Sequence, residues 1–86
     1  LFFGPQVSPE VNLEHIARER ERVTESLAAL EEVVAWLREE RSSSPGFSYY
    51  MLTVRQGILS YRARLEWCDE AEGMIKDMIP AEEVEG

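Results

Sequence analysis

The sequence predicts an all-α fold in which two long antiparallel helices, at about residues 9–41 and 45–79, form a coiled-coil-like hairpin. Two stretches carry apolar residues at the three- and four-residue steps of a helix. A short link rich in serine, with a proline and a glycine, separates them, and so short a link makes the two helices antiparallel neighbours. The second stretch is apolar over so wide an arc that one neighbour cannot cover it, which predicts that two hairpins dimerise into a helical bundle.

The first helix is predicted from a start signal and a heptad pattern. Ser8 can cap free amide groups, Pro9 suits the first helical position, and Glu10 complements the positive end of the helix dipole. The apolar positions then recur in steps of three and four, with Arg20 in the one polar slot. They are Leu13, Ile16, Val23, Leu27, Leu30, Val34 and Leu37.

The second helix is expected to begin at a second Ser-Pro pair, Ser44 and Pro45, and to end near Ile79, before Pro80. It carries two apolar stripes, which are expected to lie side by side and to cover about half of the helix surface. The first stripe consists of Phe47, Met51, Val54, Ile58, Tyr61, Leu65, Cys68, Ile75 and Ile79. The second consists of Leu52, Leu59, Ala63, Trp67, Ala71, Met74 and Met78.

A core and dimer seam follows from these patterns, although the sequence does not decide which helix forms the larger part of the dimer contact. Gly57 either permits a close approach of the helices or is merely tolerated. The predicted seam comprises Leu13, Ile16, Val23, Leu27, Leu30, Val34, Leu37, Val54, Ile58, Tyr61 and Leu65.

The predicted domain plan has one helical hairpin, residues 8–80, between two short ends. Residues 1–7 are interpreted as the end of a preceding element or linker, whose adjacent phenylalanines form a local hydrophobic plug. Residues 81–86 form an acidic tail. Because the chain begins at Leu1 rather than at a methionine, a further N-terminal part of the protein is expected to be missing.

Composition excludes several classes of function. A formal net charge of −8 over 86 residues repels phosphate, so no residue of this segment is expected to bind DNA. One cysteine permits no internal disulfide, and no apolar run approaches the roughly 20 residues of a membrane span, so a cytoplasmic protein is expected. The single histidine, His15, and the single cysteine, Cys68, accompany no catalytic or phosphate-binding motif. We therefore expect no enzyme, no metal and no cofactor.

Two parts of the sequence resemble the C-terminal domain of PadR-family, virulence-activator-like transcription regulators. One is the start, LFFG followed by a Ser-Pro-Glu helix opening. The other is the run LTVRQGILSYRARLEWCDEA at residues 52–71. The matching residues in that run are Gly57, Tyr61, Leu65, Glu66 and Trp67, whereas Cys68 replaces the leucine usual in the family.

The resemblance implies a function. Such regulators bind operator DNA through an N-terminal winged-helix domain, which would be the missing part here. Their C-terminal domain is a dimerisation arm that can contribute to an effector site. The alternative from another class is a free-standing helical adaptor that binds a different protein through the second stripe.

Two candidate sites follow, each with a simpler alternative. Tyr61, Trp67 and Met74 are candidates for an effector cleft between subunits that holds a flat aromatic compound, or else for ordinary packing. Arg20, counted back from the link, falls level with about Trp67. Glu66 and Glu70 flank that point, and Arg20 is predicted to pair with one of them, Glu66 above all, within the hairpin or across the dimer, and so to set the register. The alternative is that Arg20 extends its charge into solvent.

Overall fold

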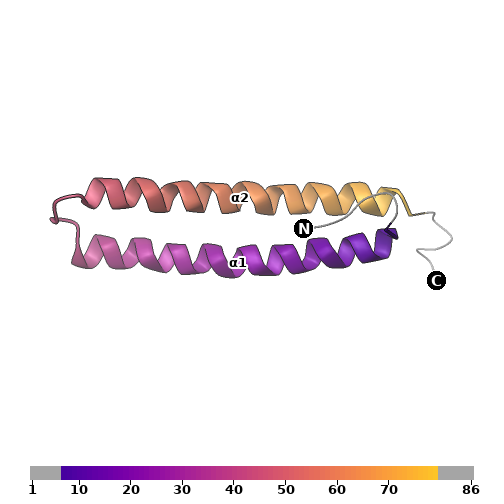
Figure 1. Ribbon diagram of the computed structural model, residues 1–86, viewed down its shortest axis with the longest axis horizontal. Helices are drawn as coiled ribbons and strands as arrows, with labels where there is room; N and C mark the ends of the chain where they lie inside the picture. The colour runs from indigo at the N-terminus through magenta and orange to yellow at the C-terminus, as the bar shows by residue number, and fades with distance from the viewer. Residues whose placement is uncertain (1–6, 80–86) are drawn as a thin grey trace.

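A computed structural model, which describes residues 7–79, shows two antiparallel helices packed against each other (Figure 1). Helix α1 spans Pro9–Glu40 and helix α2 spans Phe47–Asp77, so the predicted all-α hairpin is confirmed. The predicted plug and acidic tail lie outside the described residues, apart from Val7. The molecule measures 60 × 21 × 15 Å with a radius of gyration of 18.2 Å. A compact chain of this length has a radius of gyration of about 12 Å. The hairpin is therefore an elongated rod that consists of a single layer of two helices.

Helix α1 begins as the sequence predicts. The Ser8 hydroxyl accepts a hydrogen bond from the Val11 amide at 3.2 Å, Pro9 is the first helical residue, and Glu10 lies in the first turn. At the other end the Arg41 amide donates to the Leu37 carbonyl at 2.9 Å. The helix therefore ends one residue before the predicted limit.

The second helix begins two residues later than predicted, because the Ser44–Pro45 pair belongs to a turn. The Phe47 amide donates to the Ser44 carbonyl at 3.1 Å, and Gly46 has φ 85° and ψ −1°. Proline followed by a residue at positive φ is the pattern of a type II turn. A turn from Arg41 to Ser44 precedes it, with the Ser44 amide 3.0 Å from the Arg41 carbonyl. Two consecutive turns thus reverse the chain.

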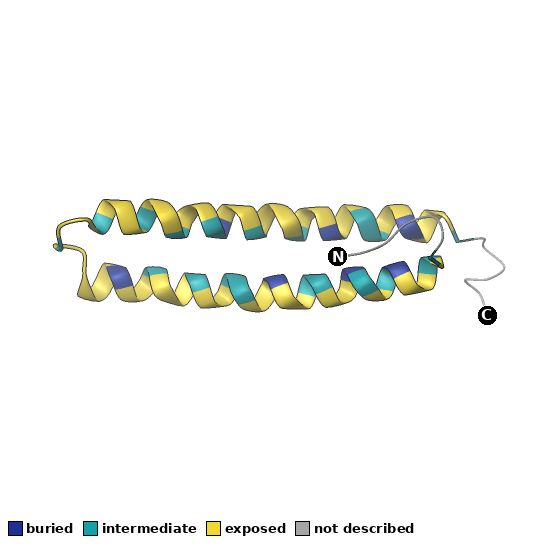
Figure 2. Cartoon of the chain, viewed as in Figure 1, coloured by how far each residue is buried: buried dark blue, intermediate teal, exposed yellow. Residues whose placement is uncertain are grey.

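The buried residues lie mainly on the sides of α1 and α2 that face each other (Figure 2). All eleven residues of the predicted seam are buried or half-buried there. A Cβ atom added to Gly57 would lie 2.8 Å from Leu30 Cδ1, so the glycine does permit a close approach of α2 to α1. The buried apolar side chains among the described residues are Ile16, Val23, Leu37, Ile58, Cys68 and Ile75, of which Ile16, Val23 and Cys68 are fully enclosed.

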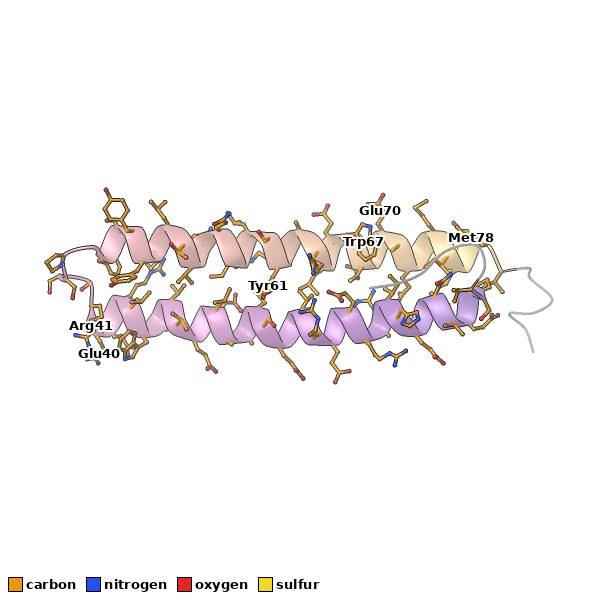
Figure 3. The ribbon with its side chains drawn as sticks, viewed as in Figure 1. Glu40, Arg41, Tyr61, Trp67, Glu70 and Met78 are labelled. Carbon is orange, nitrogen blue, oxygen red and sulfur yellow. The ribbon has the colours of Figure 1, made fainter. Side chains whose placement is uncertain are left out.

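The two stripes of α2 lie on roughly opposite faces, not side by side as predicted. Leu59 and Ala63 each stand two residues from Tyr61, which is about 200° round the helix. Tyr61 lies on the side of α2 that faces α1 (Figure 3), whereas every residue of the second stripe except Ala71 is exposed. Ala71, at the edge of this stripe, is half-buried and packs against the core. Helix α2 therefore presents a second apolar surface on the far side of the hairpin.

Candidate functional site

The largest exposed apolar feature of α2 is its second stripe, hereafter the outer stripe: Leu52, Leu59, Ala63, Trp67, Ala71, Met74 and Met78. Leu52 is 67 % exposed, Leu59 52 %, Met74 57 % and Met78 65 %. These four side chains have more than half of their surface in water, although the same helix buries Ile58, Cys68 and Ile75 on its other side. A helix with apolar side chains on two faces is suited to lie between two neighbours.

A shallow hollow of about 230 Å³ lies on the C-terminal half of the outer stripe. Trp67 and Met74 both line it, as do Glu70 and Met78, and Figure 3 shows Trp67, Glu70 and Met78 along this part of α2. Tyr61, the third residue of the predicted effector cleft, does not line it. Tyr61 and Trp67 are six residues apart and thus about 120° apart round the helix. The predicted cleft lies between subunits and stays a prediction; within one chain Trp67 and Met74 line the same hollow and Tyr61 lies in the seam.

A second hollow, of about 510 Å³, lies at the turn end of the hairpin. Its walls include Trp36 and Tyr50, from the two helices, and Pro45 from the turn. The Arg41 guanidinium lies 5.3 Å from the centre of the Trp36 ring, a cation–π contact. Sequence reasoning did not single out Arg41, because a stacking contact at a helix end has no periodic signal.

Arg20 is the central charge between the helices, but its partners within the hairpin differ from the predicted one. Its guanidinium donates to Glu72 Oε2 at 3.0 Å and to Asp69 Oδ1 at 3.1 Å, not to Glu66. Asp69 and Glu72 are three residues apart, one turn of α2, so a single guanidinium can reach both. Glu66 is exposed, on the flank of α2 that is turned away from α1. Arg20 therefore does not simply extend into solvent.

The register of the hairpin is nevertheless close to the predicted one. The contact between Leu30 and Gly57 places these residues level with each other. In an antiparallel pair the residue numbers of level positions have a constant sum, so Arg20 is level with Trp67. Asp69 is two residues and Glu72 five residues beyond that level, so the arginine side chain reaches about half a turn to one and a half turns further along α2 to its carboxylates.

Further ion pairs join the helices on either side of Arg20. Glu19 Oε1 accepts from Arg64 at 3.2 Å and also from Arg22 of its own helix. Arg62 lies 3.4 Å from Glu31. The hydrogen bond from Arg22, with that from Arg64, holds the pKa of Glu19 below its usual value despite partial burial. The hydrogen bond from Arg20 likewise lowers the pKa of Glu72. Both carboxyls are therefore held in the charged form.

The one cysteine of the sequence is placed in the core of the hairpin. Cys68 is fully buried between the helices, and this burial raises the pKa of its thiol, which disfavours the reactive thiolate. Within residues 7–79 no group of three potential metal ligands comes together. No helix in the same range is both long and apolar enough to cross a membrane.

Comparison with protein families assigns the chain. The family described as "Virulence activator alpha C-term" matches residues 1–76, which include all of α1 and all of α2 except Asp77. The chain belongs to this family. As a virulence activator C-terminal domain it carries the outer stripe and the ion pairs described above, and the coarser part of the resemblance seen in the sequence is confirmed. No curated protein and no solved structure matched the chain.

Proposed function

We propose that this hairpin is the dimerisation domain of a PadR-like, DNA-binding transcription regulator. The observation that carries the proposal is the outer stripe, of which the hairpin leaves Leu52, Leu59, Met74 and Met78 more than half exposed. Burial of a large aliphatic side chain contributes about 1.5–3 kcal/mol. Four half-exposed side chains from each of two copies therefore provide a driving force comparable to the cost of association, about 4–15 kcal/mol.

The thinness of the hairpin supports the same proposal. Small domains bury a low fraction of their surface and commonly gain stability by association. Here only two helices enclose the core, in a molecule that is 60 Å long. A second hairpin on the free face of α2 would convert this rod into a bundle with two layers of core.

A functional assay tests dimerisation directly. The chain is fused to a DNA-binding headpiece that represses a reporter gene only as a dimer. We expect repression by the fusion, and loss of repression when Leu59→Glu places a charge in the outer stripe. Thr24→Glu, on an exposed position of α1, is the matched control and should retain repression. A fusion that accumulates in the cell but does not repress would contradict the proposal.

DNA binding itself belongs, in this proposal, to a winged-helix domain that precedes the hairpin in a cytoplasmic regulator. A symmetric dimer arm sets the distance between two recognition helices, and this distance selects half-sites about one DNA turn apart. The coding sequence upstream of Leu1 tests the assignment. We expect it to encode a winged helix with a basic recognition helix. Another kind of domain there would point to the adaptor function instead.

Effector sensing is the second part of the proposal. The hollow beside Trp67 has about 230 Å³, below the roughly 300–1,000 Å³ typical of small-molecule pockets. A second subunit over the outer stripe would supply the missing wall for a planar aromatic effector. Titration of a Trp36→Phe variant with planar aromatic dyes follows Trp67 alone. Saturable quenching is expected, and its absence with every dye tested would remove this part of the proposal.

A further inference from the structure

Helix α2 is polarised in charge along its length. From Phe47 to Arg64 it carries three arginines and no acidic residue. From Leu65 to Asp77 it carries five acidic residues and one lysine. The basic half is next to the turn and the acidic half is next to the chain ends. Two such helices attract each other when they are antiparallel and repel each other when they are parallel.

Helix α1 accounts for only part of this polarity, through the pairs of Arg62 and Arg64 with Glu31 and Glu19 and those of Asp69 and Glu72 with Arg20. It carries more acidic than basic residues in both halves, so it presents no basic half that matches the acidic half of α2. Four charged side chains of α2 also take part in none of the ion pairs of the described residues: Arg55, Glu66, Glu70 and Asp77. These four charges, together with the most exposed side chains of the outer stripe, Leu52, Leu59, Met74 and Met78, are features of α2 that the hairpin leaves in water.

We propose that a second copy of this chain covers the outer stripe, with the two α2 helices antiparallel and the two-fold axis level with Leu65. The inference rests on the proposed dimerisation and specifies the face, the direction and the register of the contact. An α2–α2 contact of this kind is isologous, because the same surface of each chain meets itself.

The apolar side chains agree with this axis position. In an antiparallel pair centred at Leu65, Trp67 is level with the partner's Ala63, and Leu59 is level with the partner's Ala71. Each large side chain thus meets a small one, as close packing requires. At the ends of the contact Leu52 is level with the partner's Met78. Six of the seven outer-stripe residues therefore meet another member of the stripe, and the hollow beside Trp67 gains its second wall.

The four unused charges agree with the same axis, as does Arg62, which also pairs with Glu31 of α1. At about 100° per residue, Arg55, Arg62, Glu66, Glu70 and Asp77 fall on one flank of the outer stripe, and Figure 3 shows Glu70 directed away from α1. A two-fold axis across the contact brings this flank against the same flank of the partner. Arg62 is then within two residues of level with the partner's Glu66 and the partner's Glu70. Arg55 has the same relation to the partner's Asp77.

Spin-label distances test direction and register together. A nitroxide is attached to Ser60→Cys or to Ser48→Cys, both exposed, and Cys68 is kept because it is buried. At 1.5 Å per residue the two labels of a dimer are separated along the helix by about 15 Å at position 60 and about 51 Å at position 48. A short distance for Ser60→Cys and a long one for Ser48→Cys is the expected result. Similar short distances at both positions would show a parallel dimer and overturn the inference, while the dimer itself would stand. A monomer at about 100 μM would overturn both proposals.

Charge reversal tests the flank independently. Arg55→Glu places a carboxylate opposite the partner's Asp77, and Asp77→Arg places two guanidinium groups opposite each other. Each single variant should raise the dimer dissociation constant about tenfold, since two symmetric attractions become repulsions. The double variant R55E/D77R restores attraction and should return within about threefold of the native value. Arg18→Glu and Glu14→Arg, on exposed positions of α1, are the matched controls for net charge. A double variant as weak as the single ones, or single variants no weaker than the controls, would overturn the inference.

Discussion

Gly57 lies in α2 directly opposite the Leu30 side chain, and this position allows a test of close helix approach. Replacement of a helical glycine by alanine gains about 1 kcal/mol of helix propensity. At Gly73, where a new Cβ meets nothing within 4 Å, the whole gain is expected. At Gly57 the Cβ would lie 2.8 Å from Leu30 Cδ1, so the leucine must shift at a cost of about 0.5–1.5 kcal/mol. Chemical denaturation should therefore show that Gly73→Ala stabilises the protein and that Gly57→Ala changes it little. Equal stabilisation by both would contradict the close approach.

Arg20 gives the hairpin a stability that depends on pH. The hydrogen bond from Arg20 lowers the pKa of Glu72 in the folded state, so the unfolded chain binds a proton more readily. This contribution is fully present above the unfolded pKa, near 4.5, and is lost as the pH falls through the lower folded pKa. Arg20→Gln should therefore lower the melting temperature at about pH 7, with a smaller difference from the native chain at about pH 2.5. Circular dichroism measures both, and an equal difference at the two pH values would contradict the role of Glu72.

At the residue scale, the sequence indicated that Arg20 needs a carboxylate but not which one. A charge in a heptad core position predicts an acidic partner on the facing helix. The choice among Glu66, Asp69 and Glu72 depends on how far the arginine side chain extends along α2 and on which flank each carboxylate lies. Residue spacing determines only backbone positions. It therefore predicted which residue of α2 lies level with Arg20, but not which carboxylates the arginine side chain reaches within the hairpin.

At the scale of the elements, the start of α1 was predictable and the start of α2 was not. Ser8 and Pro9 are followed by residues that continue the helix, so they mark its beginning. Ser44 and Pro45 are followed by Gly46, whose positive φ ends the type II turn before α2 can begin. A Ser-Pro pair therefore predicts a helix start only where the next residue can itself be helical.

Gly46 provides the test of this turn. A residue with a Cβ atom at φ 85° is strained, so Gly46→Ala should destabilise the hairpin by about 1–2 kcal/mol. Gly46→Asn should cost less, because asparagine tolerates the left-handed region better than alanine does. Thermal unfolding of both variants at one protein concentration measures the difference. Unchanged stability of Gly46→Ala would show that the turn adopts another conformation.

The relation between the two stripes of α2 also belongs to the scale of the element. Both stripes were recognised from their spacing, and the burial pattern agrees with that division. Their angular relation was wrong because two stripes that begin near each other in sequence need not be adjacent round the helix. Neighbours in sequence are separated by about 100°, and residues two apart by about 200°. The correction changes the architecture expected of a dimer, since α2 then lies between α1 and the second subunit.

At the scale of the whole molecule, the sequence predicted the hairpin from the shortness of its link and from two complementary seams. It also indicated an apolar surface that a single hairpin cannot cover. The charge polarity of α2 was present in the sequence as well, but its meaning depends on knowing which side of α2 faces α1. Without that knowledge, the arginines and carboxylates of α2 are interpreted as an ordinary charged, solvated surface.

Sedimentation equilibrium of the 86-residue chain shows whether two hairpins associate through the outer stripe. At micromolar concentration the native chain should sediment with twice its 9.9 kDa mass, whereas Leu59→Glu should shift it toward 9.9 kDa. Circular dichroism of the same samples reports whether the helices remain formed. A native chain with full helicity and a mass of 9.9 kDa at that concentration would contradict this association.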